Sequence, residues 1–77
     1  MVLHIELLNK NLLLTPHSFE RMVERKISID ELKNLLESKS TQVTFLKNGN
    51  IKLTDGTLTA IVRWNGKEFY LVTVYRD

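Results

Sequence analysis

Apolar and polar residues alternate through the second half of the chain, and three glycines interrupt the alternation. Each glycine follows an amide or acid residue, as Asn48-Gly49, Asp55-Gly56 and Asn65-Gly66. Such pairs tolerate the positive φ angles of type I′ turns, which connect antiparallel strands. The pattern therefore predicts a meander of four antiparallel strands, at residues 42–47, 50–54, 57–64 and 67–76.

Two-residue turns would also set the register of this sheet. They would pair Lys47 with Asn50, Thr54 with Thr57, and Trp64 with Lys67. One face would then be mostly apolar and carry Thr44, Leu46, Ile51, Leu53, Leu58, Ala60, Val62, Trp64, Phe69, Leu71, Thr73 and Tyr75. The opposite face would carry Val43, Phe45, Lys47, Lys52, Thr54, Thr59, Ile61, Arg63, Glu68, Tyr70, Val72, Val74 and Arg76.

Helical spacing replaces this alternation upstream, between residues 15 and 38. Thr15 is a suitable N-cap and Pro16 a suitable first residue for a helix that runs to about Lys26. A second helix begins with the capping box of Ser28 and Glu31. The apolar stripes expected to face the sheet are Phe19, Met22 and Val23 on the first helix, and Ile29, Leu32, Leu35 and Leu36 on the second.

The N-terminal residues give a weaker pattern. Residues 2–8 favour an edge strand, with a short helix as the alternative, residues 9–11 a turn, and residues 12–14 an extended lead-in. With 77 residues the chain is long enough for one domain, residues 1–77. The expected fold is therefore α+β, with two short helices packed on one face of a twisted antiparallel sheet of four or more strands.

Composition narrows the classes of function. The chain has no cysteine, which excludes disulfides, thiol catalysis and cysteine-based zinc sites. His4 and His17 do not have the spacing of a metal motif, so we expect neither a metal nor a cofactor. No apolar run approaches the roughly 20 residues of a membrane span, and we expect a cytoplasmic protein without a membrane partner.

The first predicted helix carries the strongest candidate chemistry. On a helix, His17, Arg21 and Arg25 fall within about 80° of one another and form a cationic row. A neutral imidazole can act as a general base, and two guanidinium groups can bind a phosphate. Alternatively, Glu20 and Glu24 on the neighbouring strip could pair with the arginines and make this an ordinary solvated face.

Two hydroxyl groups on the last strand extend this candidate site. The predicted register places Thr73 and Tyr75 on the apolar face, where a hydroxyl needs a hydrogen-bond partner. If the first helix crosses that end of the sheet, both would meet its cationic row in one shallow concavity. Otherwise they would simply form the edge of the core.

The opposite face of the predicted sheet mixes basic, aromatic and aliphatic residues. Lys47, Lys52, Arg63 and Arg76 alternate there with Phe45 and Tyr70, a combination that can hold single-stranded nucleic acid. Basic residues also keep an exposed sheet soluble. Ile61, Val72 and Val74 on this face indicate that the N-terminal segment or a partner chain could cover it, as in a homodimer.

Residues 14–28 resemble the signature of a family of small prokaryotic proteins, T-x-H-x-x-x-R-M-x-x-R-x-I-S, and residues 71–76, LVTVYR, resemble its closing strand. That family is similar to the RelE-like toxins and other small metal-independent ribonucleases. The resemblance implies cleavage of RNA by attack of a 2′-hydroxyl on the adjacent phosphate, without a cofactor. It implies His17 as base or acid, Arg21 and Arg25 as phosphate-binding residues, and Thr73 with Tyr75 as positioning residues.

The resemblance also implies RNA and a cognate antitoxin-like protein as partners. A net charge of +2 is much lower than that of RelE-like toxins, and phosphate contacts supply most of the affinity for nucleic acid. The alternative function is therefore a catalytically inactive module that binds a protein or a nucleic acid.

Overall fold

Six strands and two helices make up the computed structural model, which describes all 77 residues. In chain order they are β1 (Val2–Ile5), β2 (Lys10–Leu13), α1 (Pro16–Glu24), α2 (Ile29–Glu37), β3 (Gln42–Phe45), β4 (Asn50–Thr54), β5 (Leu58–Trp64) and β6 (Phe69–Arg76). The α+β class is confirmed. The expected N-terminal edge strand is confirmed for Val2–Ile5 only. The turn occupies residues 6–9, where the expectation was 9–11, and Lys10–Leu13 forms a second strand of a hairpin.

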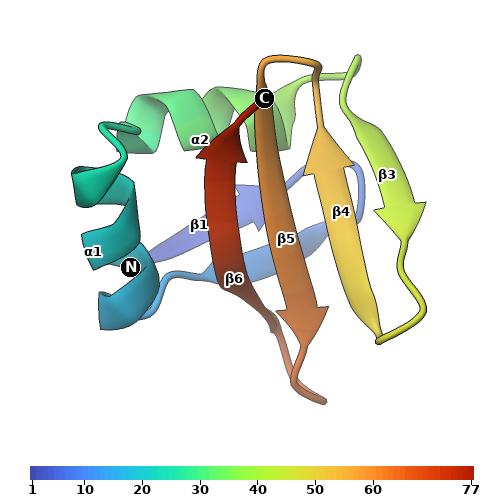
Figure 1. Cartoon of the computed structure of the whole chain (residues 1–77). Coiled ribbons are helices and arrows are strands. Elements are labelled where there is room, and N and C mark those ends of the chain that lie inside the picture. Colours follow the sequence, from blue (N-terminus) through green and yellow to red (C-terminus); the bar gives the residue numbers. More distant parts are fainter.

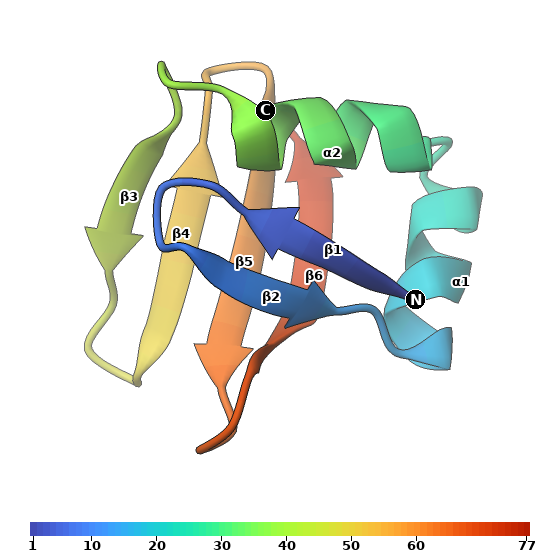
Figure 2. The ribbon, with the colours of Figure 1, turned by 180° about the vertical axis from the view of Figure 1, so that it is seen from behind.

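The strands form one sheet in the order β1-β2-β6-β5-β4-β3. The expectation of a purely antiparallel sheet is wrong, because β2 runs parallel to β6, where Leu12 pairs with Phe69 and Leu13 with Tyr70. The β1–β2 hairpin then crosses behind the other four strands (Figures 1 and 2). Turn signals in a sequence govern neighbouring strands only, so they could not reveal this pairing of the two chain ends.

The first turn of the meander is one residue longer than predicted. The Leu46 amide donates to the Asn50 carbonyl at 2.8 Å, which makes residues 47–49 the loop. Because side chains alternate, this shift of one residue moves every side chain of β3 to the other face. The predicted faces of β3 are therefore wrong, and Val43 packs against the core.

The other two turns are shifted by two residues, which preserves the faces. The amide of Asp55 donates to the Leu58 carbonyl and that of Asn65 to the Glu68 carbonyl. The side-chain oxygens of Asp55 and Asn65 accept the amides that follow each glycine, an arrangement that fixes these turns. The apolar face is thus confirmed for Ile51, Leu53, Leu58, Ala60, Val62, Phe69 and Leu71, all of which are buried.

A β-bulge in β6 reverses the faces beyond Leu71. Val62 pairs with Leu71 but Ile61 pairs with Thr73, so Val72 is an extra residue. Val74 is consequently buried opposite Ala60, whereas it was predicted on the outer face. Thr73 and Tyr75 pair with Ile61 and Thr59 and point away from the core, which contradicts their predicted inward position.

Both helices begin with the predicted caps. Thr15 forms a capping box with Ser18, and Ser28 forms one with Glu31. On α2 the predicted Leu32, Leu35 and Leu36 are buried, and this helix packs across β1, β4 and β5.

The position of α1 differs from the prediction, because α1 lies beside β6 at the edge of the sheet (Figure 1). Only a narrow strip of this helix is therefore covered. Ser18 and Met22 are buried, but Phe19 and Val23 are 42% and 64% exposed, so that part of the predicted stripe is wrong.

One core of 16 buried apolar residues lies between the inner face of β4–β6, α2 and the β1–β2 hairpin. Its members from the hairpin are Ile5 and Leu12, both of which are fully buried. The outer face of β3–β6, turned to the viewer in Figure 1, has no helix or hairpin over it. Neither helix has the length and apolar character that crossing a membrane requires.

Candidate active site

The candidate catalytic row lies on the exposed side of α1. His17 is in the first turn after the Thr15 cap and Pro16, and Arg21 follows one turn later. The Nε of Arg21 donates to Nε2 of His17 at 3.2 Å. A guanidinium group can only donate, so Nε2 carries no proton in this arrangement. The lone pair of Nε2 is therefore engaged by Arg21, and the imidazole can act as a general base once Arg21 releases it.

Arg25 joins this row to the sheet. It caps the C-terminal end of α1, and its Nη1 donates to the Thr73 hydroxyl at 2.8 Å and to the Val74 carbonyl at 2.7 Å. The bulge at Val72 is the cause of the first contact, because it turns Thr73 outward and toward the helix. The expected meeting of the row with the last strand is thus confirmed for Arg25 and Thr73.

The structure does not bring all the predicted residues together. Tyr75 is 38% exposed and makes no side-chain hydrogen bond. The predicted inward concavity is wrong, since Thr73 and Tyr75 face outward. None of the three hollows on the surface is lined by a residue of the row, so the site is an open ridge along α1 and β6.

The charge of this ridge is not neutralised internally. The chain has one ion pair between permanently charged groups, Arg76 with Glu31, and His4 lies 4.0 Å from Glu6. The ion pairs envisaged between the arginines of α1 and the acids of the same helix are therefore absent. Arg21 and Arg25 keep uncompensated positive charge that an anion could neutralise.

Groups that could hold a metal are also absent from the site. No cluster of three or more histidine, cysteine or acidic side chains occurs in the chain. His4, on β1, has Asn11 at 3.4 Å and Glu6 at 4.0 Å as its polar neighbours. The polar groups of the ridge can supply proton transfer and phosphate binding without a metal.

A second cationic group near this end of β6 was not predicted. Arg76 was expected on the outer face, but the bulge turns it toward the helices, where it contacts Glu31 at 2.5 Å and the Lys26 carbonyl at 2.6 Å. The hydrogen bond from Arg76, and then that from the Ser28 amide, lower the pKa of Glu31 from 4.5 to about 2. The guanidinium group of Arg76 is thus bonded within the protein and does not add to the positive charge of the ridge.

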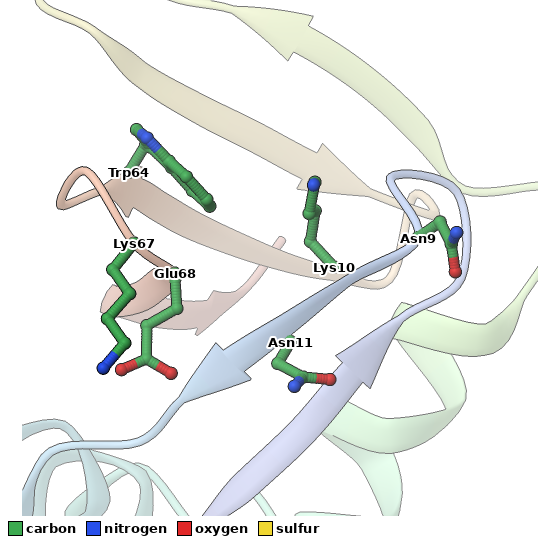
Figure 3. A pocket seen from close by; sticks show the side chains of 6 residues that line it. All are labelled: Asn9, Lys10, Asn11, Trp64, Lys67 and Glu68. Carbon is green, nitrogen blue, oxygen red and sulfur yellow. The ribbon is translucent and has the colours of Figure 1, made fainter.

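Sequence reasoning also missed a hollow of about 310 Å³ between the turn of the β1–β2 hairpin and the β5–β6 turn. Its lining residues are Asn9, Lys10, Asn11, Trp64, Lys67 and Glu68 (Figure 3). The available signal was the mixture of a tryptophan, two lysines and two asparagines beside predicted turns. These groups come from opposite ends of the chain, and only the parallel pairing of β2 with β6 brings them together.

Comparisons with known proteins add no family to these observations. No family model, no curated protein and no solved structure matches the chain. A function therefore has to be inferred from the side chains themselves.

Proposed function

We propose that the protein is a metal-independent endoribonuclease whose active site is the ridge between α1 and β6. The observation that carries the proposal is the contact of Arg25 with Thr73, which makes the row on α1 continuous with the last strand. The ridge then combines an imidazole whose Nε2 accepts a hydrogen bond from Arg21, two guanidinium groups without acidic partners, and a hydroxyl group. These are the groups required for attack of a 2′-hydroxyl on a phosphodiester.

The reaction would proceed in one displacement. Nε2 of His17 takes the proton of the 2′-hydroxyl, and the 2′-oxygen forms a bond to phosphorus. The bond from phosphorus to the 5′-oxygen breaks, and that oxygen takes a proton from water. The products are a 2′,3′-cyclic phosphate and a 5′-hydroxyl, and the histidine returns its proton to solvent.

Arg21 would couple phosphate binding to activation of the base. In the unbound protein its Nε shares the lone pair of His17. A phosphate is a stronger acceptor for a guanidinium, and Arg21 would turn to it and release the imidazole. Arg25, held by Thr73 and the Val74 carbonyl, would supply a fixed second positive charge for the charge that develops on the phosphate.

The toxin-like, RelE-like character is part of the same proposal. It is supported by the helix signature of residues 14–28 and by two helices combined with the antiparallel strands β3–β6. RNA would be the substrate, and the uncovered outer face of the sheet offers room for an antitoxin-like protein or a second copy of the chain. Tyr75, exposed beside this site, would position a base of the RNA.

Cleavage of a labelled single-stranded RNA in the presence of EDTA tests this proposal. We expect the wild-type protein to release fragments that end in 2′,3′-cyclic phosphates. His17→Ala should lower the rate about 100-fold or more, because general-base catalysis is worth that much. Arg21→Ala should lower it by a similar factor through loss of phosphate stabilisation.

Matched variants control for charge and for histidine content. Lys33→Ala removes an exposed cation from α2, and His4→Ala removes the other imidazole. Both should cleave at the wild-type rate. Equal rates in all five proteins, or no cleavage by any of them, would remove the proposal.

A catalytically inactive binding module is the second candidate, and the bare outer face of the sheet favours it. Lys52, Arg63 and Tyr70 lie there without a covering element. This function predicts that Tyr70→Ala and Arg63→Ala weaken binding of a single-stranded RNA or a protein partner more than His17→Ala does. Cleavage in EDTA that depends on His17 decides against it.

A further inference from the structure

The hollow between the two turns combines an aromatic ring with uncompensated positive charge (Figure 3). Trp64 is the only tryptophan of the chain and remains 42% exposed although it ends a buried strand. Its indole packs against Phe69 in an edge arrangement, with ring centroids 5.0 Å apart and planes inclined at 62°. An aromatic ring that remains accessible can act as a stacking platform for a base.

The polar groups around the ring favour an anion. The ammonium group of Lys10 lies over the Trp64 ring, 5.8 Å from its centroid, so this face of the ring already attracts a charged group. Lys67 and Glu68 leave the β5–β6 turn side by side along the opposite rim (Figure 3). Neither lysine forms an ion pair, so two cations are present against one carboxylate.

Ring stacking and phosphate binding in one hollow are the requirements of a nucleotide. We propose that the hollow binds one nucleotide unit, with its base stacked on Trp64 and its phosphate between Lys10 and Lys67. The ammonium group of Lys10 would leave the ring face when the base occupies it, and would move to the phosphate. The amide of Asn9 can donate to and accept from a base edge, and that of Asn11, whose oxygen contacts His4, can donate, which makes the site tolerant of base identity.

This inference rests on the proposed function in one respect, because it takes the nucleotide to be part of the same RNA. The hollow lies at the turns, whereas the ridge lies along α1 and β6, and the two share no residue. It would therefore anchor the RNA away from the scissile phosphate. Such a site would raise the affinity for RNA of a protein whose net charge is only +2.

Tryptophan fluorescence measures this binding directly, because Trp64 is the only tryptophan of the chain and lies in the hollow. Adenosine 5′-monophosphate should quench the emission in a saturable manner, and adenosine should bind about tenfold more weakly because it lacks the phosphate. Lys67→Glu should lower the affinity for the monophosphate about tenfold and leave the affinity for adenosine unchanged. Lys10→Ala should also lower the affinity for the monophosphate. It serves as the test variant if Lys67→Glu does not fold.

Lys39→Glu makes the same charge change at an exposed position after α2 and should bind as the wild type does. The absence of saturable quenching, or equal affinity for adenosine and its monophosphate, would overturn the proposal. His17→Ala should retain full quenching. Quenching without any RNA cleavage would leave this site standing and remove the nuclease, whereas cleavage without quenching would remove only this site.

Discussion

Arg76 connects three parts of the chain through one side chain. Its guanidinium group donates to both carboxylate oxygens of Glu31 and to the Lys26 carbonyl, and so ties the end of β6 to the link between α1 and α2. Glu31 also accepts the Ser28 amide at the start of α2. The carboxylate is therefore bonded on two sides, which explains why its pKa is lowered to about 2.

This lowered pKa makes part of the stability depend on pH. An acid with a folded-state pKa below its unfolded value stabilises the fold fully above the unfolded value. For Glu31 that contribution is lost as the pH falls from 4.5 toward 2. We expect urea unfolding of the wild-type protein to show a loss of stability in this window that Glu31→Gln does not show.

Glu37→Gln, at the exposed C-terminal end of α2, is the matched control and should follow the wild-type pH dependence. Parallel pH profiles for the wild type and Glu31→Gln would show that the contact with Arg76 contributes nothing to folding.

At the scale of an element, the bulge in β6 decides which residues reach the candidate site. One extra residue, Val72, places Val74 in the core and turns Thr73 toward Arg25. The sequence could not reveal it, because alternation through residues 69–76 fits an unbroken strand equally well. The same ambiguity explains why Thr73, Tyr75 and Arg76 were predicted on the wrong faces, whereas the residues before the bulge were placed correctly.

Deletion of Val72 should therefore be far more harmful than its substitution. Without the extra residue, either Val74 leaves the core or the β5–β6 pairing slips, and the burial of one valine is lost. We expect a decrease of about 1.5–3 kcal/mol in the free energy of unfolding, measured by urea denaturation. The contact of Arg25 with Thr73 would be lost as well, and with it the proposed RNA cleavage.

Val72→Ala keeps the residue count and therefore the register. Because Val72 is 37% exposed, this substitution should cost less than about 1 kcal/mol. Equal stability of the deletion and the substitution would show that the bulge does not set the faces of β6.

For the whole molecule, the sequence predicted the features that depend on nearby residues and missed the contacts between residues far apart in the chain. The caps at Thr15 and Ser28 and the apolar face of β4 and β5 depend on neighbours within a few residues, and they are correct. The parallel pairing of Leu12 with Phe69 joins residues 57 positions apart. Of the candidate site, the row on α1 followed from helical spacing, but its contact with β6 depended on tertiary packing.

The β1–β2 hairpin closes the core from behind, so its apolar side chains should stabilise the entire chain. Leu12→Ala should lower the free energy of unfolding by about 2–5 kcal/mol, as for other buried leucines. Fluorescence of Trp64, which contacts the hairpin through Lys10, and far-ultraviolet circular dichroism should give the same midpoint in urea. Separate midpoints would show that the hairpin unfolds independently of the rest.

Leu7→Ala, in the turn of the same hairpin, is a suitable control. Leu7 is 43% exposed, and its truncation should change the stability by no more than about 0.5 kcal/mol.

The two borders of the sheet are protected unequally. β1 packs against α2, and the Glu6 amide at its end donates to the Leu36 carbonyl. The side of β6 that faces away from β5 is covered by β2 and α1. β3 pairs with β4 alone and carries Phe45 at 73% exposure. Its outer backbone groups are consequently open to strand addition, and self-association in concentrated solution should begin at this strand.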